Sequence, residues 1–223
     1  KGITREIIDD AVLGCANQAG EDNRNVGRMS VLLAGLPVTV GGVTVNRLCG
    51  SGMQAVIDAS RAIMTGEGDI MIAGGTESMT RAPFVMPKAT EAFTRTNAVY
   101  DTTIGWRFTN PKLAKMYYPY SMGETAENVA KRYNIARERQ DEFAMHSQQK
   151  AKEAILGGKF RNEITAVEII SKKETIVFDV DEFPRLDTTI EKLAKLKPAF
   201  AKEGGTVTAG NSSGVNDGAC AIL

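Results

Sequence analysis

Gly42-Val-Thr-Val-Asn-Arg-Leu-Cys-Gly-Ser-Gly-Met-Gln54 is a β-branched run that passes through a glycine-rich turn into residues at helical spacing. The helical pattern continues to Gly66, and a second apolar run, Asp69-Ile-Met-Ile-Ala73, follows it and is closed by Gly74-Gly75. β-Branched runs favour strands, and apolar residues three or four apart favour a helix. A strand, a helix and a strand in this order predict a right-handed βαβ crossover in a mostly parallel sheet.

Further strand patterns lie on both sides of this unit. Ala11–Cys15 predicts a short buried strand, and Thr206–Gly210 and Ala219–Leu223 return to strand character near the other end of the chain. We therefore expect an α/β core formed by residues 1–79 and 206–223, with flanking helices.

The pattern between these core segments is different. Residues 80–205 contain loops rich in Pro, Thr and Asn, and two amphipathic helices, one around Ala126–Tyr133 and one from about Arg137 to Leu156. An insertion of this length is more typical of a functional lid than of a passive loop.

Composition excludes several classes of protein. The 223 residues include 27 basic and 27 acidic side chains, so the basic footprint of a nucleic-acid-binding protein is missing. No run approaches the ~20 apolar residues of a membrane span, so we expect no membrane partner. Three widely spaced cysteines and one histidine argue against a disulfide framework and a metal centre. These features favour a folded protein of a reducing compartment, the cytoplasm.

Cys49 carries the densest chemical signal. The pattern places it at the end of a buried strand and the start of a helix, between small residues that would let a substrate approach the sulfur. Unpaired amide groups and the helix dipole at such a position favour the reactive thiolate and could hold an oxyanion. Residue spacing alone leaves two alternatives open: an ordinary buried cysteine, and a phosphate-binding turn, although no phosphate-loop motif is present.

Four motifs taken together resemble the thiolases, a family of CoA-dependent acyltransferases. They follow one another in the family's order and extend over almost the whole chain: Val45-Asn-Arg-Leu-Cys-Gly-Ser-Gly52, Gly74-Gly-Thr-Glu-Ser-Met79, Ser121-Met-Gly-Glu-Thr-Ala-Glu-Asn128 and Gly205-Thr-Val-Thr-Ala-Gly-Asn-Ser-Ser-Gly-Val-Asn-Asp-Gly-Ala219. Gly14–Asn25, Gly105–Phe108 and Asp181–Arg185 look most like the 3-oxoadipyl-CoA thiolases, and a general acetyl-CoA acetyltransferase is the other subtype considered.

The resemblance implies a role for individual residues. Cys49 would be the nucleophile that takes the acyl group from a 3-oxoacyl-CoA and passes it to CoA, which is a substrate rather than a tightly bound cofactor. Residues 80–205 would cover CoA, and Met122 would line the acyl pocket. The CoA contacts would come from Arg185, Phe200, Ala209 and Ser213. The alternatives are a solvated charge for Arg185, and ordinary packing for Phe200 and Met122.

The chain departs from the family pattern in what it lacks. The family completes its site with a Gly-His-Pro histidine and a second cysteine in a Cys-x-Gly-Gly turn, and neither motif is in this sequence. The only histidine, His146, is expected on the polar face of a helix, and Cys15 and Cys220 are expected to be inert core thiols. Ala136 stands where a capping serine is usual, at a cost of ~1 kcal/mol.

These features lead us to interpret the chain as a fragment that is inactive alone. We expect the full-length protein to form a homodimer or homotetramer. Two alternatives are a non-catalytic module that binds acyl-CoA or lipid, and a ketoacyl synthase of the same superfamily. The intact Cys49 disfavours the module, and the motif strings disfavour the synthase.

Overall fold

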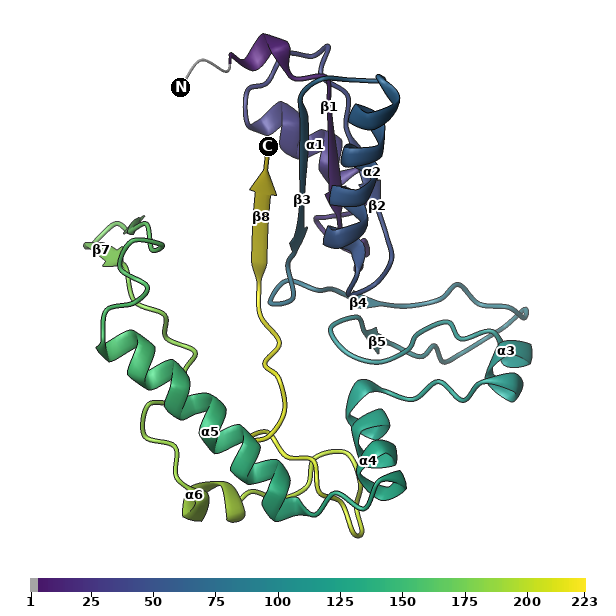
Figure 1. Ribbon diagram of the computed structural model, residues 1–223. Coiled ribbons are helices and arrows are strands. Elements are labelled where there is room, and N and C mark those ends of the chain that lie inside the picture. Colours follow the sequence, from purple (N-terminus) through teal and green to yellow (C-terminus); the bar gives the residue numbers. More distant parts are fainter. Residues whose placement is uncertain (1–3) are drawn as a thin grey trace. The chain divides into compact units, whose positions relative to one another are not determined.

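The computed structural model describes residues 4–223 and divides into two compact units (Figure 1). The first unit contains the residues up to Pro119 together with Val215–Leu223, and the second is Tyr120–Gly214.

The first unit is built on a four-stranded sheet. Its core elements are η1 (Arg5–Ile7), β1 (Asp10–Gly14), α1 (Val26–Leu33), β2 (Val43–Val45), α2 (Ser51–Thr65), β3 (Met71–Glu77) and β8 (Gly218–Ile222). The strand order is β2-β1-β3-β8, in which β1 is parallel to both of its neighbours and β8 is antiparallel to β3. The predicted α/β fold with a mostly parallel sheet is confirmed.

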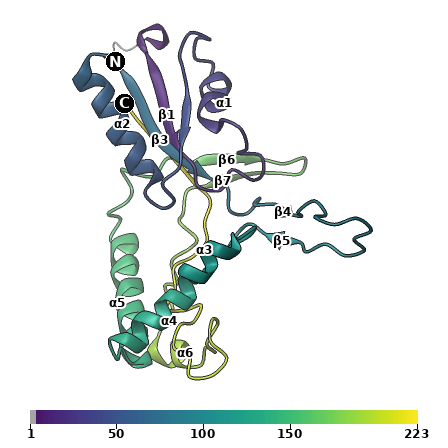
Figure 2. The ribbon, with the colours of Figure 1, turned by 90° about the vertical axis from the view of Figure 1, so that its right-hand side faces the viewer.

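Helices α1 and α2 cover opposite faces of the sheet (Figure 2). On one face, Ala11 packs with Val31 of α1 and with Val40. On the other face, Met71 and Ala73 pack against Ala59 of α2. Successive strand residues point to opposite faces, which is why Ile72 packs with the first cluster and its two neighbours with the second.

Strand β3 is longer than the sequence predicts. The prediction closes this strand at Gly74 and Gly75, but the strand runs through both glycines to Glu77. A Cβ at Gly74 would lie 2.1 Å from the carbonyl oxygen of Cys220, and one at Gly75 would lie 2.9 Å from that of Gly14. These glycines therefore permit close backbone approach inside the sheet instead of ending the strand.

Residues 80–119 belong to the first unit, although the sequence assigns them to the insertion. They contain the paired strands β4 (Phe84–Val85) and β5 (Tyr100–Asp101) and the helix α3 (Pro111–Met116). The buried side chain of Asn17 donates to the carbonyl oxygen of Thr102 at 3.0 Å, and Arg107 donates to Asn17 Oδ1 at 2.7 Å. These hydrogen bonds tie the segment to the loop after β1.

The second unit is mainly helical. Its elements are α4 (Met122–Arg132), α5 (Arg137–Leu156), the hairpin β6 (Val167–Ile170) with β7 (Thr175–Phe178), and α6 (Ile190–Ala194). The predicted bounds of α5 match the observed ones, and the Ala126–Tyr133 pattern corresponds to α4. The strand predicted at Thr206–Gly210 is wrong, because this segment is a loop of the second unit.

In the described residues, no helix combines the length and the apolar character that crossing a membrane requires.

Candidate functional site

Cys49 lies at the corner between β2 and α2. The thiol-bearing residue is exposed, so the alternative of an ordinary buried cysteine does not hold in this structure. Its surroundings differ in detail from the prediction. β2 is a partly exposed edge strand that ends at Val45, and α2 begins at Ser51 with Gly50 as its N-cap. Cys49 is therefore two residues before the helix.

Two polar side chains hold this corner. Asn46 Oδ1 accepts from the amide of Leu48 at 2.9 Å, and its Nδ2 donates to the carbonyl oxygen of Ala16 at 3.1 Å. Ser51 Oγ accepts from the amide of Arg47 at 2.8 Å and donates to the carbonyl oxygen of Leu48 at 2.6 Å. Both backbone groups of Leu48 are thus bonded to side chains of the corner.

Leu48 adopts an unfavourable backbone conformation. Its φ is 50°, in the left-handed region that costs an L-residue ~1–2 kcal/mol. The hydrogen bonds from Asn46 and Ser51 offset this cost. As a result the chain turns sharply just before Cys49.

The first turn of α2 supplies amide groups near Cys49. The amide of Gly50 donates to Arg47 and that of Ser51 to Leu48, so these two groups are already used. The first bond in helical register is from Gln54 to Gly50. The amides of Gly52 and Met53 precede it, and such first-turn groups have no partner within the helix.

Cys15 is a different kind of thiol. It is buried at the end of β1, where burial, followed by the carboxylates of Glu77 and Asp22, raises its pKa to about 12. Its Sγ, Asp22 and Glu77 offer ligand atoms within 4.8 Å of one another. A thiol that stays protonated at neutral pH is neither a good nucleophile nor a good metal ligand. This agrees with the expected inert core thiol.

Cys220 does not fit the same expectation. It lies on β8, all five residues of which are exposed, so its prediction as a core thiol is wrong for this structure. β8 is an edge strand of the sheet. Its continuous run of apolar residues, by contrast, is typical of a strand that is buried on both faces.

The other five predicted site residues belong to the second unit. Met122 is the first residue of α4 and is exposed. The ring of Phe200 lies on the neighbouring Gly123, where a Cβ would be 2.2 Å from the ring. The structure therefore brings Phe200 to the N-terminal end of α4 beside Met122.

Ala209 and Ser213 are exposed residues of one loop, which is held from α4. The carboxylate of Glu127 accepts from the amides of Thr206 at 2.9 Å and Val207 at 2.8 Å, and from the hydroxyl of Thr206 at 2.9 Å. Glu127 thus links this loop to the helix that carries Met122.

A second anchor acts further along the same loop. Asn211 donates to Asp141 Oδ1 at 2.9 Å, and Arg137 pairs with the other oxygen of this buried carboxylate at 2.7 Å. The loop is therefore bonded to the N-terminal part of α5 as well as to α4.

Arg185 is exposed in the segment between β7 and α6. Its amide donates to Gln148 Oε1 of α5 at 2.8 Å, and its carbonyl oxygen accepts from Thr188. The adjacent Asp187 pairs with Lys192, which holds the pKa of that carboxyl below its usual value. The backbone of Arg185 is fixed while its side chain extends from an exposed position.

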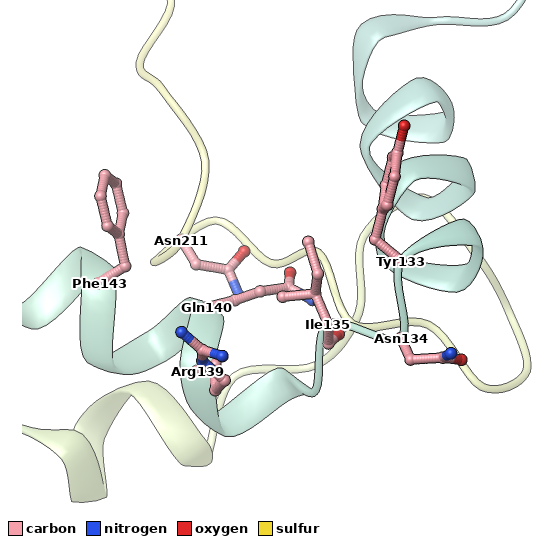
Figure 3. Close-up of a pocket in the computed structure, with 7 residues that line it drawn as sticks. All are labelled: Tyr133, Asn134, Ile135, Arg139, Gln140, Phe143 and Asn211. Carbon is pink, nitrogen blue, oxygen red and sulfur yellow. The ribbon is translucent and has the colours of Figure 1, made fainter.

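The second unit also contains a pocket of about 430 Å³. It is lined by Tyr133, Asn134, Ile135, Arg139, Gln140, Phe143 and Asn211. Figure 3 shows Tyr133 and Phe143 on either side of it, with Gln140 and Asn211 between them. It includes none of the predicted site residues, and His146 is an exposed residue of α5 outside it.

Sequence reasoning missed the residues that hold the site. Asn46, Ser51, Glu77 and Glu127 all lie within the quoted motifs, but no role was assigned to them. An Asn two residues before a position that needs a left-handed backbone is a recognisable turn signal. The contacts of Glu77 and Glu127 span 60 residues or more, and no local pattern predicts them.

Comparison with known proteins gives consistent results. Residues 1–223 match the family described as the N-terminal domain of thiolase. A β-ketoadipyl-CoA thiolase of Acinetobacter baylyi is 58% identical over 97% of this chain and 54% of its own length. An Escherichia coli K12 relative named 3-oxoadipyl-CoA/3-oxo-5,6-dehydrosuberyl-CoA thiolase is 56% identical over 99% of this chain and 55% of its own.

A solved structure agrees with the sequence comparisons. The crystal structure of the Bacillus anthracis acetyl-CoA acetyltransferase matches with a TM-score of 0.84 and 39% identity, over 99% of this chain and 54% of that one. The chain therefore spans about half the length of the relatives that it matches.

Proposed function

Because the chain belongs to the thiolase family, we propose that the protein transfers an acyl group between a 3-oxoacyl-CoA and CoA through an acyl group bound to Cys49. The observation that carries this proposal is the exposed thiol of Cys49 beside the N-terminal turn of α2. An exposed thiol is accessible to a substrate, and the first-turn amides of α2 lie near it.

The proposed reaction has two halves. In the first, the sulfur of Cys49 bonds to the 3-oxo carbon, the bond between carbons 2 and 3 breaks, and the electron pair left on carbon 2 takes up a proton to give acetyl-CoA. In the second, the sulfur of CoA attacks the thioester carbon, its proton is lost, and Cys49 leaves as the thiolate. The amides of Gly52 and Met53 are candidates for stabilising the oxyanion of either half.

We propose 3-oxoadipyl-CoA as the substrate, with acetoacetyl-CoA as the alternative. The support comes from relatives named for the first compound, which are 55 to 58% identical, against 46% for a Chromobacterium violaceum protein named acetyl-CoA acetyltransferase. The choice between these two substrates rests on the similarity to named relatives, since Met122 is the one residue that we assign to the acyl pocket.

The CoA contacts are part of the same proposal. Phe200 would form an apolar wall for the pantetheine, Ala209 and Ser213 would contact it, and Arg185 would lie near the adenine. Their exposure on the second unit is compatible with these roles. We further propose that residues 80–205 act as the cover of CoA, although the two compact units of the structure divide at Pro119 and Gly214.

Turnover would need more than these 223 residues. The histidine and second cysteine that the family uses for proton transfer have no counterpart in this sequence, so we propose that the isolated chain is inactive. For the full-length protein we propose a homodimer or homotetramer in the cytoplasm.

The test compares three forms of the full-length protein: wild type, Cys49→Ser and Cys15→Ala. Wild type and Cys15→Ala are expected to cleave 3-oxoadipyl-CoA with CoA, and Cys49→Ser is expected to lose this activity. With 3-oxoadipyl-CoA and no added CoA, mass spectrometry should find the acyl group on the Cys49 peptide. Thiolysis that survives in Cys49→Ser would overturn the acyl-enzyme. A wild type that binds CoA but cleaves neither substrate would favour the non-catalytic module.

The CoA contacts have a separate test. CoA should slow the alkylation of Cys49 by iodoacetamide in the full-length protein, and Arg185→Ala should need a higher CoA concentration for the same protection. Arg161→Ala is the control, because this exposed arginine of the second unit has no assigned role. Equal protection in all three proteins would remove Arg185 from the proposed site.

A further inference from the structure

The strained corner before Cys49 has a dedicated support. Leu48 holds a φ of 50° although it is neither glycine nor asparagine. A residue in this region persists only where its surroundings fix it, and such positions concentrate at functional sites. The contacts that hold Leu48 in this conformation therefore indicate how the site is built.

Asn46 is placed to fix it. Its Oδ1 accepts from the amide of Leu48 at 2.9 Å, which closes a turn around the intervening residue, and its Nδ2 donates to the carbonyl oxygen of Ala16 at 3.1 Å. One side chain thus bonds the corner on one side and the loop after β1 on the other.

The loop after β1, to which Asn46 is bonded, is itself held in place. Glu77, at the end of β3, accepts from the amides of Ala16 at 2.9 Å and Asn17 at 2.8 Å. The amide of Cys15 donates to Val45 at 3.1 Å. The carbonyl of Ala16 is therefore a fixed point, tied to two strands of the sheet.

We propose that Asn46 is a positioning residue for Cys49: it holds Leu48 in its left-handed conformation against the fixed carbonyl of Ala16, and so sets the direction in which the thiol is presented. This inference rests on the proposed function of Cys49. In the proposed role, Asn46 acts through the backbone and touches no reacting atom.

The test uses the full-length protein and the variants Asn46→Ala and Asn46→Ala/Leu48→Gly. We expect Asn46→Ala to lower kcat for thiolysis roughly 10- to 100-fold with a change in KM below about twofold, since a small misplacement of a reacting group costs rate more than binding. Glycine adopts the left-handed conformation without steric cost, so the added Leu48→Gly should recover about half or more of the lost factor on a logarithmic scale.

Asn97→Ala is the matched control, because Asn97 is an exposed residue of the loop between β4 and β5. Circular dichroism and Tm of every variant separate positioning from folding. A purely structural role predicts a lower Tm in Asn46→Ala and no recovery of kcat on adding Leu48→Gly. That result, or a kcat of Asn46→Ala within twofold of wild type, would overturn the proposal.

The two proposals fail in different ways. If Cys49→Ser keeps thiolysis, the proposed function is wrong whatever Asn46 does. In that case the rate of Cys49 alkylation by iodoacetamide still tests the corner, because Asn46→Ala should change this rate and the added Leu48→Gly should return it toward wild type. An unchanged alkylation rate would show that Asn46 does not position the thiol.

Discussion

Gly14 ends β1 directly against the first turn of α2. A Cβ at this position would lie 2.4 Å from the carbonyl carbon of Ser51 and 2.6 Å from the amide nitrogen of Gly52. Both atoms belong to backbone, so neither can rotate away, and α2 would have to move. Because α2 carries the Cys49 corner at its start, the absence of a side chain at Gly14 sets where the thiol lies.

Gly14→Ala is therefore expected to lower the free energy of unfolding by ~1–3 kcal/mol, the usual cost of overpacking. Gly52→Ala is the matched control, since a Cβ there meets nothing within 4 Å. Alanine is the better helix former, so this variant should not be less stable than wild type. Urea denaturation of the full-length variants measures both effects, and equal stability of the two would contradict the packing argument.

The raised pKa of Cys15 makes the stability of the folded state depend on pH in the alkaline range. Its folded pKa of about 12 lies above the ordinary value of 9.0. Above pH 9 the unfolded chain loses this proton while the folded chain keeps it, so the unfolded state binds fewer protons. The contribution of Cys15 to stability is thus fully present below pH 9 and is lost as the pH rises toward 12.

The corresponding measurement compares wild type with Cys15→Ala by urea denaturation at neutral pH and at several values above pH 9. The difference in unfolding free energy between the two should shift in favour of Cys15→Ala as the pH rises. A difference independent of pH would mean that the thiol ionises equally in both states.

At the scale of the elements, the two longest helices of the second unit differ in how they begin. α4 has a complete capping box: the amide of Glu124 bonds to Ser121 Oγ at 3.3 Å, and the amide of Ser121 bonds to the Glu124 carboxylate at 2.8 Å. α5 begins after Ala136, which has no side chain to cap the helix, although its φ of −64° and ψ of 153° are suitable for a cap.

Ala136→Ser should therefore raise the free energy of unfolding by ~1 kcal/mol, and Ser121→Ala should lower it by a similar amount. Thermal unfolding of the full-length variants checks both signs. If Ala136→Ser leaves Tm unchanged while Ser121→Ala lowers it, the start of α5 is held by other contacts, such as the pair of Arg137 and Asp141.

Glu127 connects α4 to the loop of Ala209 and Ser213. Glu127→Gln replaces one acceptor oxygen by a donor that faces the amides of Thr206 and Val207. Leaving buried donors unsatisfied costs ~1–3 kcal/mol, so we expect lower stability together with a several-fold higher KM for CoA. Glu163→Gln, at an exposed glutamate, should change neither quantity. A changed Tm with an unchanged KM would separate the loop from CoA binding.

The elements themselves follow largely from local sequence. The bounds of α5 and the order of strand, helix and strand around Cys49 were predictable because hydrophobic spacing and glycine signals are local. The packing faces were not. Helix α2 buries the small residues Ser51, Ala55 and Ala59 and leaves the larger apolar residues Met53 and Met64 exposed. Small residues pack there because the helix lies close to β1 and β3. The distance between helix and sheet cannot be predicted from the spacing of apolar residues in the sequence.

The candidate site also has features that are local in sequence and features that depend on the tertiary structure. The corner that carries Cys49 was predictable because its flanking glycines and the change of period mark the passage from strand to helix. The role of Cys49 as nucleophile stays a prediction. Phe143 of α5 is exposed and lines a pocket, a position that the helical spacing of apolar residues does not indicate. The supports of the site, Glu77 and Glu127, act on residues 60 and 79 positions away, so only the tertiary structure identifies them.

At the scale of the molecule, the exposed surface is large. The chain exposes 16965 Å². A compact monomer of this length exposes roughly 10,000 Å², and two separate compact units of these sizes would expose roughly 12,000 Å².

Part of this surface is a set of apolar side chains on one face of a hairpin. In the β6–β7 hairpin, Val167 pairs with Phe178 and Ile169 with Ile176, and paired residues of an antiparallel ladder share a face. All four side chains are exposed. A two-stranded hairpin is marginally stable in water unless another surface covers it.

The 223-residue chain produced alone is therefore expected to self-associate and to bind the dye ANS, because contiguous apolar surface of this extent drives association. Light scattering coupled to size-exclusion chromatography measures the first effect, and dye fluorescence the second. Ile169→Lys/Ile176→Lys should reduce both by placing charges on the hairpin face, whereas Lys172→Glu/Lys173→Glu at the turn changes charge without touching that face. A monodisperse monomer without dye binding would mean that this apolar surface is covered by the chain itself in solution.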